Sequence, residues 1–452
     1  MKKIISFLFV TGGMFHVNAQ VSFSSGGQFN VDAGPVSSVS ADFNNDGKVD
    51  IATANIDSYT ISVLLEQGAG GFSAPTNLPV GLQPSAIISA DFNNDSNMDL
   101  ATTNYASNNI SVLLGDGAGG FSTATNYLVD SLPWSLVASD LNGDGMIDIA
   151  TANYKSTNVS ILTGDGMGNF SSSSLLNVGI GADAITSADF NNDGKQDLAI
   201  ANFDSNTVTL FLGLGGGSFS SSAHIAVGIS PVSMIASDMN GDGKMDLVTA
   251  NNDSYNVSVL LGNGIGGFTS GPVLPVQDPW ELVATDLNND GIKDLAVANY
   301  KSLSITVFLG NSLGSFDAAL NFTCVGKPTS ITNADYNGDG NMDLAACLDF
   351  TGNVTVLLNN ALPTESPELN IGLETNFTAY PNPFTSSVTI EIPDADDNMH
   401  IELYDCLGHL LYLEKYSAAC NEVDLKKMDN GLYILKVFSD GKIVGSQKLL
   451  KR

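Results

Sequence analysis

Seven copies of one acidic phrase are the part of this 452-residue sequence best suited to chemistry. The phrase reads Asp-x-Asn-x-Asp-Gly-x-x-Asp, except that Ser96 replaces the glycine in the second copy. Successive copies start 48 or 49 residues apart, at Asp42, Asp91, Asp140, Asp189, Asp238, Asp286 and Asp335. Each copy brings three carboxylates and one amide oxygen together within nine residues, and carboxylates this close repel one another unless a cation binds between them.

Oxygen ligands of this kind favour calcium. Ca2+ accepts about six to eight oxygens in flexible geometry, whereas Mg2+ prefers fewer protein ligands and more water. We therefore predict up to seven Ca2+ ions, one per copy, with the backbone carbonyl of position 7 as a further ligand, and we expect position 6 to adopt positive φ. The predicted side-chain ligands at positions 1, 3, 5 and 9 are Asp42, Asn44, Asp46, Asp50, Asp91, Asn93, Asp95, Asp99, Asp140, Asn142, Asp144, Asp148, Asp189, Asn191, Asp193, Asp197, Asp238, Asn240, Asp242, Asp246, Asp286, Asn288, Asp290, Asp294, Asp335, Asn337, Asp339 and Asp343.

The phrase is not the loop of an EF-hand. That loop needs a bidentate Glu at position 12 between two helices, whereas the first four copies have Thr53, Thr102, Thr151 and Ile200 there. The residues that follow are small or β-branched, which is typical of strands. An acidic turn without metal is the alternative, and seven copies of the same ligand pattern favour the cation site.

Between the phrases, each repeat is expected to form four strands. In the second repeat these are residues 86–90, 100–104, 110–114 and 121–129, and four strands per repeat predict a β-propeller blade. The first strand is expected to line the central axis and the third to pack between blades. We predict an all-β protein with a seven-bladed β-propeller, calcium-binding loops and a small C-terminal β-sandwich domain.

The two ends of the repeat array predict how the propeller closes. Residues 23–32 read as a fourth strand without a repeat of their own, and the last repeat ends after its third strand at residues 354–358. We expect the first strand to complete the last blade, which would leave no unpaired strand edge at the seam.

These repeats resemble the FG-GAP and VCBS repeats of integrin alpha-like propellers and of many bacterial extracellular proteins. The resemblance covers about residues 21–360, and it implies a calcium-binding propeller of the kind found in adhesins, receptor domains and enzyme appendages. The chain lacks the Gly-Ala-Pro of the integrin form and is closer to the bacterial variety. The seventh repeat departs from the others, with Cys347-Leu348-Asp349 where they have Ala-Asn-Tyr or a similar triplet.

Both ends of the chain carry export signals. Residues 1–19 combine two lysines, an apolar stretch and Val17-x-Ala19, which together predict a secretory signal peptide. Residues 20–361 form the predicted propeller, residues 362–371 a linker and residues 372–452 a second domain. We find no later segment long enough to span a membrane.

The second domain resembles the C-terminal sorting domain of the type IX secretion system. Four separated motifs carry this resemblance: Tyr380-Pro381-Asn382-Pro383-Phe384, Leu403 to Gly408, Met428 to Val437 and Lys448 to Arg452. The resemblance implies contact with the type IX secretion machinery, passage through the outer membrane and then release or surface attachment.

Charge and composition restrict the possible partners. The chain has a formal net charge of −31 and one arginine, Arg452, so it lacks the basic clusters that nucleic acids or anionic membranes need. The pairs Cys324 with Cys347 and Cys406 with Cys420 could each form a disulfide or remain buried free thiols. We expect a monomer.

One face of the predicted propeller is suited to ligand binding. The second-to-third and fourth-to-first strand connections share this face, opposite the acidic loops. They carry aromatic residues at Tyr105, Tyr154, Phe203 and Tyr300 beside Asn104, Asn153, Asn202 and Asn299, with Trp134 and Trp280 just ahead of a first strand. Aromatic rings with amide groups suit sugars or a protein partner. Alternatively, the asparagines cap turns and the rings fill gaps between blades.

The sequence therefore predicts a secreted or outer-membrane surface protein that binds an extracellular glycan or protein, as in adhesion. The motifs of serine hydrolases, zinc proteases and phosphate-binding loops are absent, so we expect no enzyme activity. The alternatives are a polysaccharide-degrading enzyme of the propeller lyase type and a purely architectural surface protein.

Overall fold

The computed structural model describes residues 21–220, 223–349, 351–361, 377–392, 399–404, 410–415, 420–428, 431–439 and 442–451. It divides the chain into two compact units, Met1–Thr364 and Glu365–Arg452. The predicted signal peptide, the linker at 362–371 and Cys406 lie outside the described residues. No helix in the described part of the chain is long and apolar enough to cross a membrane.

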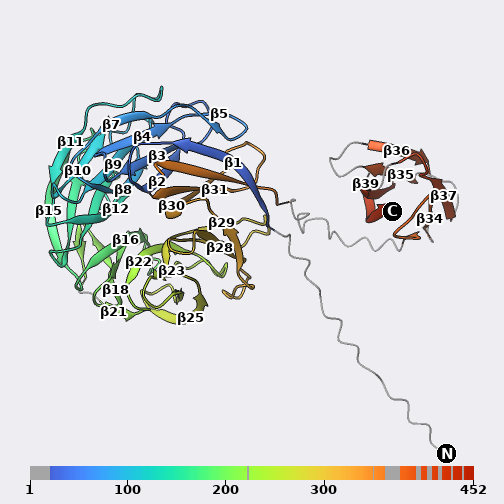
Figure 1. Ribbon diagram of the computed structural model, residues 1–452. Helices are drawn as coiled ribbons and strands as arrows, with labels where there is room; N and C mark the ends of the chain where they lie inside the picture. Colours follow the sequence, from blue (N-terminus) through green and yellow to red (C-terminus); the bar gives the residue numbers. More distant parts are fainter. Residues whose placement is uncertain are drawn as a thin grey trace, which may run out of the picture. The chain divides into compact units, whose positions relative to one another are not determined.

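The first unit consists of repeated four-stranded antiparallel sheets, which confirms the predicted all-β repeat fold (Figure 1). In the described residues of this unit there are seven such sheets. Their first strands are β2 (Pro35–Ala41), β8 (Pro84–Ala90), β12 (Pro133–Ser139), β16 (Ala182–Ala188), β22 (Pro231–Ser237), β26 (Pro279–Thr285) and β30 (Lys327–Ala334). Proline opens most of these strands, a position where its missing N–H does not weaken the sheet.

The second and third strands form the buried middle of each sheet. The second strands are β3 (Asp50–Asn55), β9 (Asp99–Asn104), β13 (Asp148–Asn153), β17 (Asp197–Asn202), β23 (Asp246–Asn251), β27 (Asp294–Asn299) and β31 (Asp343–Asp349). The third strands are β4 (Thr60–Leu64), β10 (Asn109–Leu113), β14 (Asn158–Gly164), β18 (Thr207–Phe211), β24 (Asn256–Gly262), β28 (Ser304–Phe308) and β32 (Asn353–Asn359). Both faces of these strands are covered, which explains their nearly continuous runs of apolar and small residues.

The fourth strands form the outer edge. They are β7 (Thr76–Pro79), β11 (Thr125–Leu128), β15 (Phe170–Asn177), β21 (Ala223–Ala226), β25 (Phe268–Pro275), β29 (Leu320–Thr323) and β1 (Phe23–Asn30). Two small hairpins, β5 (Glu66–Gly68) with β6 (Gly71–Phe72) and β19 (Gly213–Gly215) with β20 (Ser218–Phe219), precede two of them.

The fourth strand of the second repeat is shorter than predicted. We expected residues 121–129, whereas β11 covers Thr125–Leu128, and Phe121 forms only an isolated bridge with Gly115. The Ser122 side chain explains the interruption, because its Oγ accepts the hydrogen bond from the backbone N–H of Leu114 (2.9 Å) in the place of a backbone carbonyl.

The first strand of the chain joins the last sheet, as the sequence predicted. β1 pairs antiparallel with β32, from Phe23 opposite Asn359 to Asn30 opposite Asn353. The sheet order is therefore β1-β32-β31-β30, built from both ends of the repeat array. Two aromatic contacts fix this strand, since Phe23 lies 4.9 Å from Phe322 and Phe29 lies 5.0 Å from Phe72 between ring centroids.

Hydrophobic clusters lie between neighbouring sheets. One cluster joins Phe43 and Ile61 of the first repeat to Ile87 and Leu100 of the second. Another joins Ile51 and Leu64 of the first repeat to Ala334, Tyr336, Ala345, Cys347, Val354 and Val356 of the last. The last sheet therefore packs against the first. The Ser38 and Ser330 hydroxyls (2.7 Å) and the Ser40 and Tyr336 hydroxyls (2.6 Å) add hydrogen bonds to the same contact.

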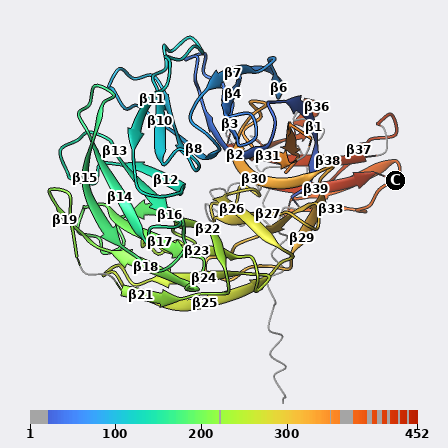
Figure 2. The same cartoon turned by 60° about the vertical axis from the view of Figure 1, so that its left-hand side comes forward.

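The first strands lie innermost in the unit, as Figure 2 shows, with the fourth strands outside. Residues of β2, β8, β12, β16, β22, β26 and β30 line one central cavity of about 550 Å³. The first strand was expected to line the axis, and this cavity confirms that expectation.

Cys324 and Cys347 are free and buried in the structure, so they do not form the disulfide that the sequence left open. Cys324 follows β29, whereas Cys347 lies within β31 and contacts the Ser37 carbonyl oxygen at 3.8 Å. Burial raises the pKa of the Cys324 thiol to about 11, so this thiol stays protonated.

The second unit contains two sheets around one core. A three-stranded sheet has the order β33 (Thr378–Tyr380), β34 (Ser387–Glu391), β37 (Cys420–Asp424), and a four-stranded sheet has the order β36 (Leu410–Lys415), β35 (Met399–Tyr404), β38 (Gly431–Ser439), β39 (Lys442–Lys451). Buried residues of both sheets, such as Val388, Ile390, Ile401 and Val437, form a single cluster. This arrangement agrees with the predicted small β-sandwich.

Candidate functional site

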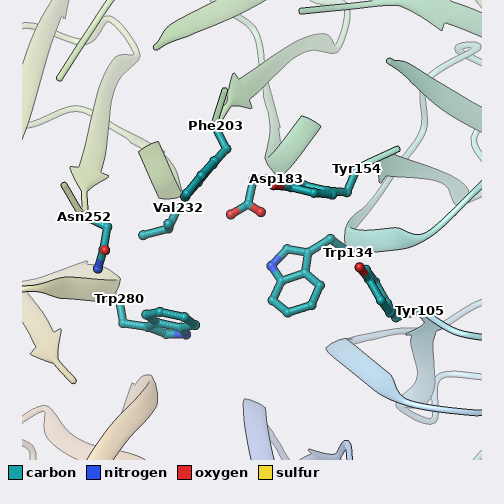
Figure 3. A pocket seen from close by; sticks show the side chains of 8 residues that line it. All are labelled: Tyr105, Trp134, Tyr154, Asp183, Phe203, Val232, Asn252 and Trp280. Carbon is teal, nitrogen blue, oxygen red and sulfur yellow. The ribbon is translucent and has the colours of Figure 1, made fainter. Parts of the chain in front are cut away.

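An aromatic pocket of about 320 Å³ opens on the face opposite the acidic loops (Figure 3). We call it the aromatic pocket. Its lining residues are Tyr105, Trp134, Tyr154, Asp183, Phe203, Val232, Asn252 and Trp280. They come from two positions of the repeat, contributed by the second to the sixth repeats.

The first of these positions is a β-bulge at the start of each first strand. In β12 the register shifts between Pro133 and Ser135, so Trp134 has no partner on the neighbouring strand. The same shift occurs in β16, β22 and β26, and it leaves Asp183, Val232 and Trp280 unpaired in the ladder. A bulge re-aims a side chain out of the regular alternation. Here it presents one residue per repeat to the pocket.

The second position is the first residue after each second strand. Tyr154 is held there because its backbone N–H donates to the Leu132 carbonyl (3.0 Å), and Tyr105 donates likewise to Gln83 (2.9 Å). Phe203 and Asn252 make the same bond to Gly181 and Ser230. These bonds tie the two connections together, so the pocket rests on a fixed backbone.

The rings of the pocket contact one another in pairs. Trp134 and Tyr105 lie 5.4 Å apart between centroids at an angle of 83°, which is the edge-to-face arrangement that aromatic pairs prefer. Tyr154 and Phe203 form a second such pair at 6.2 Å. The walls of the pocket are therefore mutually supported, and each ring keeps a surface toward the cavity.

The structure brings together five of the six aromatic residues predicted for this face: Trp134, Trp280, Tyr105, Tyr154 and Phe203. Tyr300 is placed differently. Its ring lies 5.2 Å from that of Trp280 between centroids, tilted by 32°. It lines the wider central cavity, and its hydroxyl donates to Asp349 Oδ2 (2.7 Å).

Sequence reasoning missed Asp183, Val232 and Asn252. A signal for them exists, because Asp183 lies 49 residues after Trp134, and Val232 lies 49 residues after Asp183. Comparing the second residue of each first strand across the repeats would have found Asp183 and Val232, and Asn252 lies 49 residues after Phe203 at the position that follows the second strand. None of the three is aromatic, so residue type alone does not single them out.

The repeated asparagines have the structural role that was the alternative to ligand binding. Asn104 is fully buried, and its Nδ2 donates to Asn109 Oδ1 and Ser111 Oγ, both at 2.8 Å. Asn153 makes the same pair of bonds to Asn158 and Ser160. These amides hold the turn between the second and third strands and do not reach the pocket.

The acidic loops lie at the opposite end of the sheets. In the first loop, Asp42 accepts hydrogen bonds from the backbone N–H groups of Asn44, Asp46 and Gly47, with the last at 2.8 Å. Gly47 has φ of 83°, as expected for position 6. Position 4 is also left-handed, with φ of 56° at Asn45, which explains why this position is Asn or Gly in every copy.

Position 9 of each loop is a buried carboxylate with a fixed place. Asp50 accepts hydrogen bonds from the Phe43 N–H (2.9 Å) and from the Glu66 N–H (2.7 Å), which links the loop to the turn after the third strand. Burial, together with the charges of Asp46 and Asp42, raises the pKa of Asp50 to about 6. The equivalent aspartates of the other six loops make the same two bonds.

The chemistry of these loops fits a hard cation. In the first loop, the carboxylates of Asp42 and Asp46 repel the buried carboxylate of Asp50, and a divalent ion bound between them would relieve this repulsion. In the first loop, the side-chain oxygens mainly accept hydrogen bonds from backbone N–H groups of the same loop. Among the described residues, no group of three or more His, Cys, Asp or Glu side chains is arranged so that it could hold a metal ion. The residues that would hold an ion are those at positions 1, 3, 5 and 9.

The second loop contains a strained residue. Ser96 occupies position 6 with φ of 68°, where the other copies have glycine. Substituting Ser96→Gly should stabilise the protein by about 1 kcal/mol, since a non-glycine residue in this region costs about that much. The reciprocal change Gly47→Ser is the matched control. Nothing lies within 4 Å of a Cβ placed there, so the change introduces only the backbone strain of positive φ and should destabilise the protein by a similar amount. Chemical denaturation of both variants would measure this, and a loss of stability in Ser96→Gly would contradict the explanation.

Comparison with known families gives two matches. The FG-GAP-like repeat family matches residues 42–102, 91–151, 140–200, 189–249, 238–297 and 286–346. The secretion system C-terminal sorting domain matches residues 378–452. No curated protein matches the chain.

Solved structures share the fold at low sequence identity. The chain is similar to BBS1N, solved in complex with ARL6DN, with 12% identity and a TM-score of 0.56 over 76% of this chain and 98% of that one. A functionally unknown protein from Desulfotomaculum acetoxidans DSM 771 is 11% identical with a TM-score of 0.50, over 79% of this chain and 93% of that one. An Agrocybe aegerita lectin that recognises non-reducing terminal N-acetylglucosamine is 21% identical with a TM-score of 0.49, over 65% of this chain and 81% of that one. At these identities the likeness to BBS1N and to the Desulfotomaculum acetoxidans protein concerns the fold alone.

Proposed function

Because this chain belongs to the FG-GAP-like repeat family and ends in a secretion system C-terminal sorting domain, we propose that it is an extracellular module that binds a glycan or protein. The observation that carries this proposal is the aromatic pocket, in which four consecutive repeats contribute the bulge residues Trp134, Asp183, Val232 and Trp280.

The location follows from the sorting domain. The type IX sorting domain indicates that the protein is secreted and is attached at the cell surface or outer membrane, and it implies interaction with the type IX secretion machinery. A ligand would therefore meet the pocket outside the cell, in keeping with the adhesion role that the repeats suggest.

We further propose that the seven sheets are the blades of a closed propeller that calcium stabilises. The contact of the last sheet with the first and the single cavity lined by all seven first strands support closure. The acidic loops would then form a ring at the end opposite the pocket, with up to seven Ca2+ ions. Calcium would act on the stability of the fold and not on the pocket directly.

A binding role suits the pocket better than catalysis. Asp183 is the one carboxylic acid among its eight lining residues, whereas glycoside hydrolysis uses a pair of carboxyl groups. The remaining lining groups are aromatic rings, an amide and an aliphatic side chain, which provide apolar area and oriented hydrogen bonds.

Replacing both Trp134 and Trp280 by alanine should abolish binding to the ligand. The two rings supply much of the apolar wall, and buried aromatic anchors at interfaces are each worth about 2 kcal/mol or more, so the pair should weaken binding at least 100-fold. The measurement is binding of the mature protein to a panel of glycans and matrix proteins. Tyr255→Ala is the matched control, since it removes an exposed ring outside the pocket. Equal affinity of the double variant and the unmodified protein would exclude this face.

A further inference from the structure

Asp183 is the polar residue that the fold of the aromatic pocket does not explain. Its side chain points into the pocket (Figure 3), and the residue is 7% exposed. In the part of the chain that the structure describes, no hydrogen bond or ion pair joins its carboxyl group to another residue. A buried carboxylate without a partner is costly, so its position points to a group that arrives from outside.

The backbone holds Asp183 in this position. The bulge between Ala182 and Ala184 turns the residue out of the ladder, and Gly181 before it has φ of 76°. The Gly181 carbonyl accepts the N–H of Phe203 (2.7 Å), which fixes one pocket wall beside the carboxyl group. The placement therefore follows from the fold and does not depend on a flexible side chain.

The groups around Asp183 suit a positive charge. Trp134, Tyr154, Phe203 and Trp280 line the same cavity, and the face of an aromatic ring attracts cations. Burial and the charge of Asp204 raise the pKa of the Asp183 carboxyl well above its ordinary value, and a cation bound beside it would favour the ionised form. An anionic ligand would meet this carboxyl group and a chain with a net charge of −31.

The same face already pairs a cation with a ring and a carboxylate. Lys327 Nζ lies 4.6 Å from the centroid of Tyr300, whose hydroxyl is bonded to Asp349. Lys155 Nζ lies 5.8 Å from the Tyr154 centroid, and its side chain extends from an exposed turn. A bound cation would therefore use the tryptophan walls, where the described residues place no such lysine contact.

We propose that the aromatic pocket binds an organic ammonium cation, with Asp183 as its counter-ion and Trp134 and Trp280 as aromatic walls. This inference deepens the proposed binding function and rests on it, because it uses the same pocket. Methylated ammonium groups suit the site best, since they are poorly hydrated and make contact with several rings at once. The ammonium could be carried by a small molecule or by a side chain or sugar of a larger ligand.

The chain offers a specific readout for this proposal. Its two tryptophans, Trp134 and Trp280, both line the aromatic pocket, so intrinsic tryptophan fluorescence reports on this site. The mature protein is titrated with choline, with n-butylammonium and with 3,3-dimethylbutan-1-ol, a neutral compound of nearly the same shape as choline. Choline should change the fluorescence in a saturable manner and bind at least tenfold more tightly than the neutral compound. If butylammonium binds more tightly than choline, the cation belongs to a primary amine, as in lysine or an amino sugar.

Variants test the role of Asp183. Asp183→Asn should weaken choline at least tenfold and leave the neutral compound unchanged. Asp57→Asn is the matched control, because it removes the same charge from the wider cavity but not from the aromatic pocket. Equal binding of choline and the neutral compound, or unchanged choline binding in Asp183→Asn, would overturn the proposal.

The outcome also separates this inference from the proposed function. If a neutral glycan or a protein binds through Trp134 and Trp280 while ammonium compounds do not, the inference fails and the binding function stands. If nothing on the panel binds and the ammonium compounds do not bind either, both fail.

Discussion

Removing calcium with a chelator is expected to lower the melting temperature of the mature protein by more than about 10 °C. Extracellular sites bind calcium with dissociation constants of about 0.1–1 mM. At 10 mM calcium, one such site would therefore add about 1.4–2.7 kcal/mol to the free energy of unfolding. Seven independent sites would add on the order of 10–19 kcal/mol, and each kcal/mol shifts the melting temperature of a large domain by about 2 °C. Calorimetry with calcium and with chelator measures the effect.

Two controls tie this effect to the loops. Asp42→Asn, together with Asp46→Asn, removes ligands from the first loop and should reduce the calcium stoichiometry by one in isothermal titration. Asp57→Asn removes an acid outside the loops and should leave the stoichiometry unchanged. A melting temperature that is the same with calcium and with chelator would rule out calcium as a cofactor of the fold.

Deleting residues 21–32 is expected to prevent stable folding of the first unit. The deletion removes β1, leaves β32 as an exposed edge strand, and takes away Phe23 and Phe29 from their contacts with Phe322 and Phe72. Phe23 and Phe29 are half-buried, so the loss of each should cost less than the about 3–5 kcal/mol of a fully buried phenylalanine. The whole antiparallel pairing with β32 is lost with them, and a typical protein is stable by only about 5–15 kcal/mol. Circular dichroism and size-exclusion chromatography would show unfolding or aggregation.

A peptide gives this prediction its control. Adding a peptide with the sequence of residues 21–32 should restore a folded monomer, whereas a scrambled peptide should not, because pairing with β32 requires the native register. A deletion variant that melts at the same temperature as the full protein would show that β1 does not hold the first and last sheets together.

Most of the fold could be predicted from the repeat period of the sequence. The four strands of each sheet were predicted from the spacing of 48 or 49 residues, the loop aspartates and the runs of small or β-branched residues. The predicted strand at residues 23–32 has no repeat of its own, and this indicated that it pairs with the last repeat. These features are local or repeated, so each copy supports the others. The end of the second repeat was less accurate, because a single Ser122 side chain replaces a ladder bond there.

The aromatic residues of the candidate site could be predicted from the sequence, but the residues that surround them in the structure could not. Trp134, Trp280, Tyr105 and Tyr154 stand out in the sequence by type, and the structure gathers them in one pocket. Tyr300 has the same residue type and repeat position as Tyr154. However, its hydroxyl donates a hydrogen bond to Asp349, and Lys327 Nζ lies 4.6 Å from the centroid of its ring. Neighbours from another repeat decide which of two equivalent residues faces a ligand.

The sequence by itself determined the repeat, the all-β class, the acidic loops and the route out of the cell, because each of these depends on residue types at a fixed spacing. Only the tertiary structure decided that Asp183 stands among aromatic rings without a partner. A β-bulge turns one residue per repeat toward the centre, and the packing of successive sheets then brings residues 49 positions apart into one pocket. The chemistry of the pocket therefore arises between repeats, where no single copy of the pattern contains it.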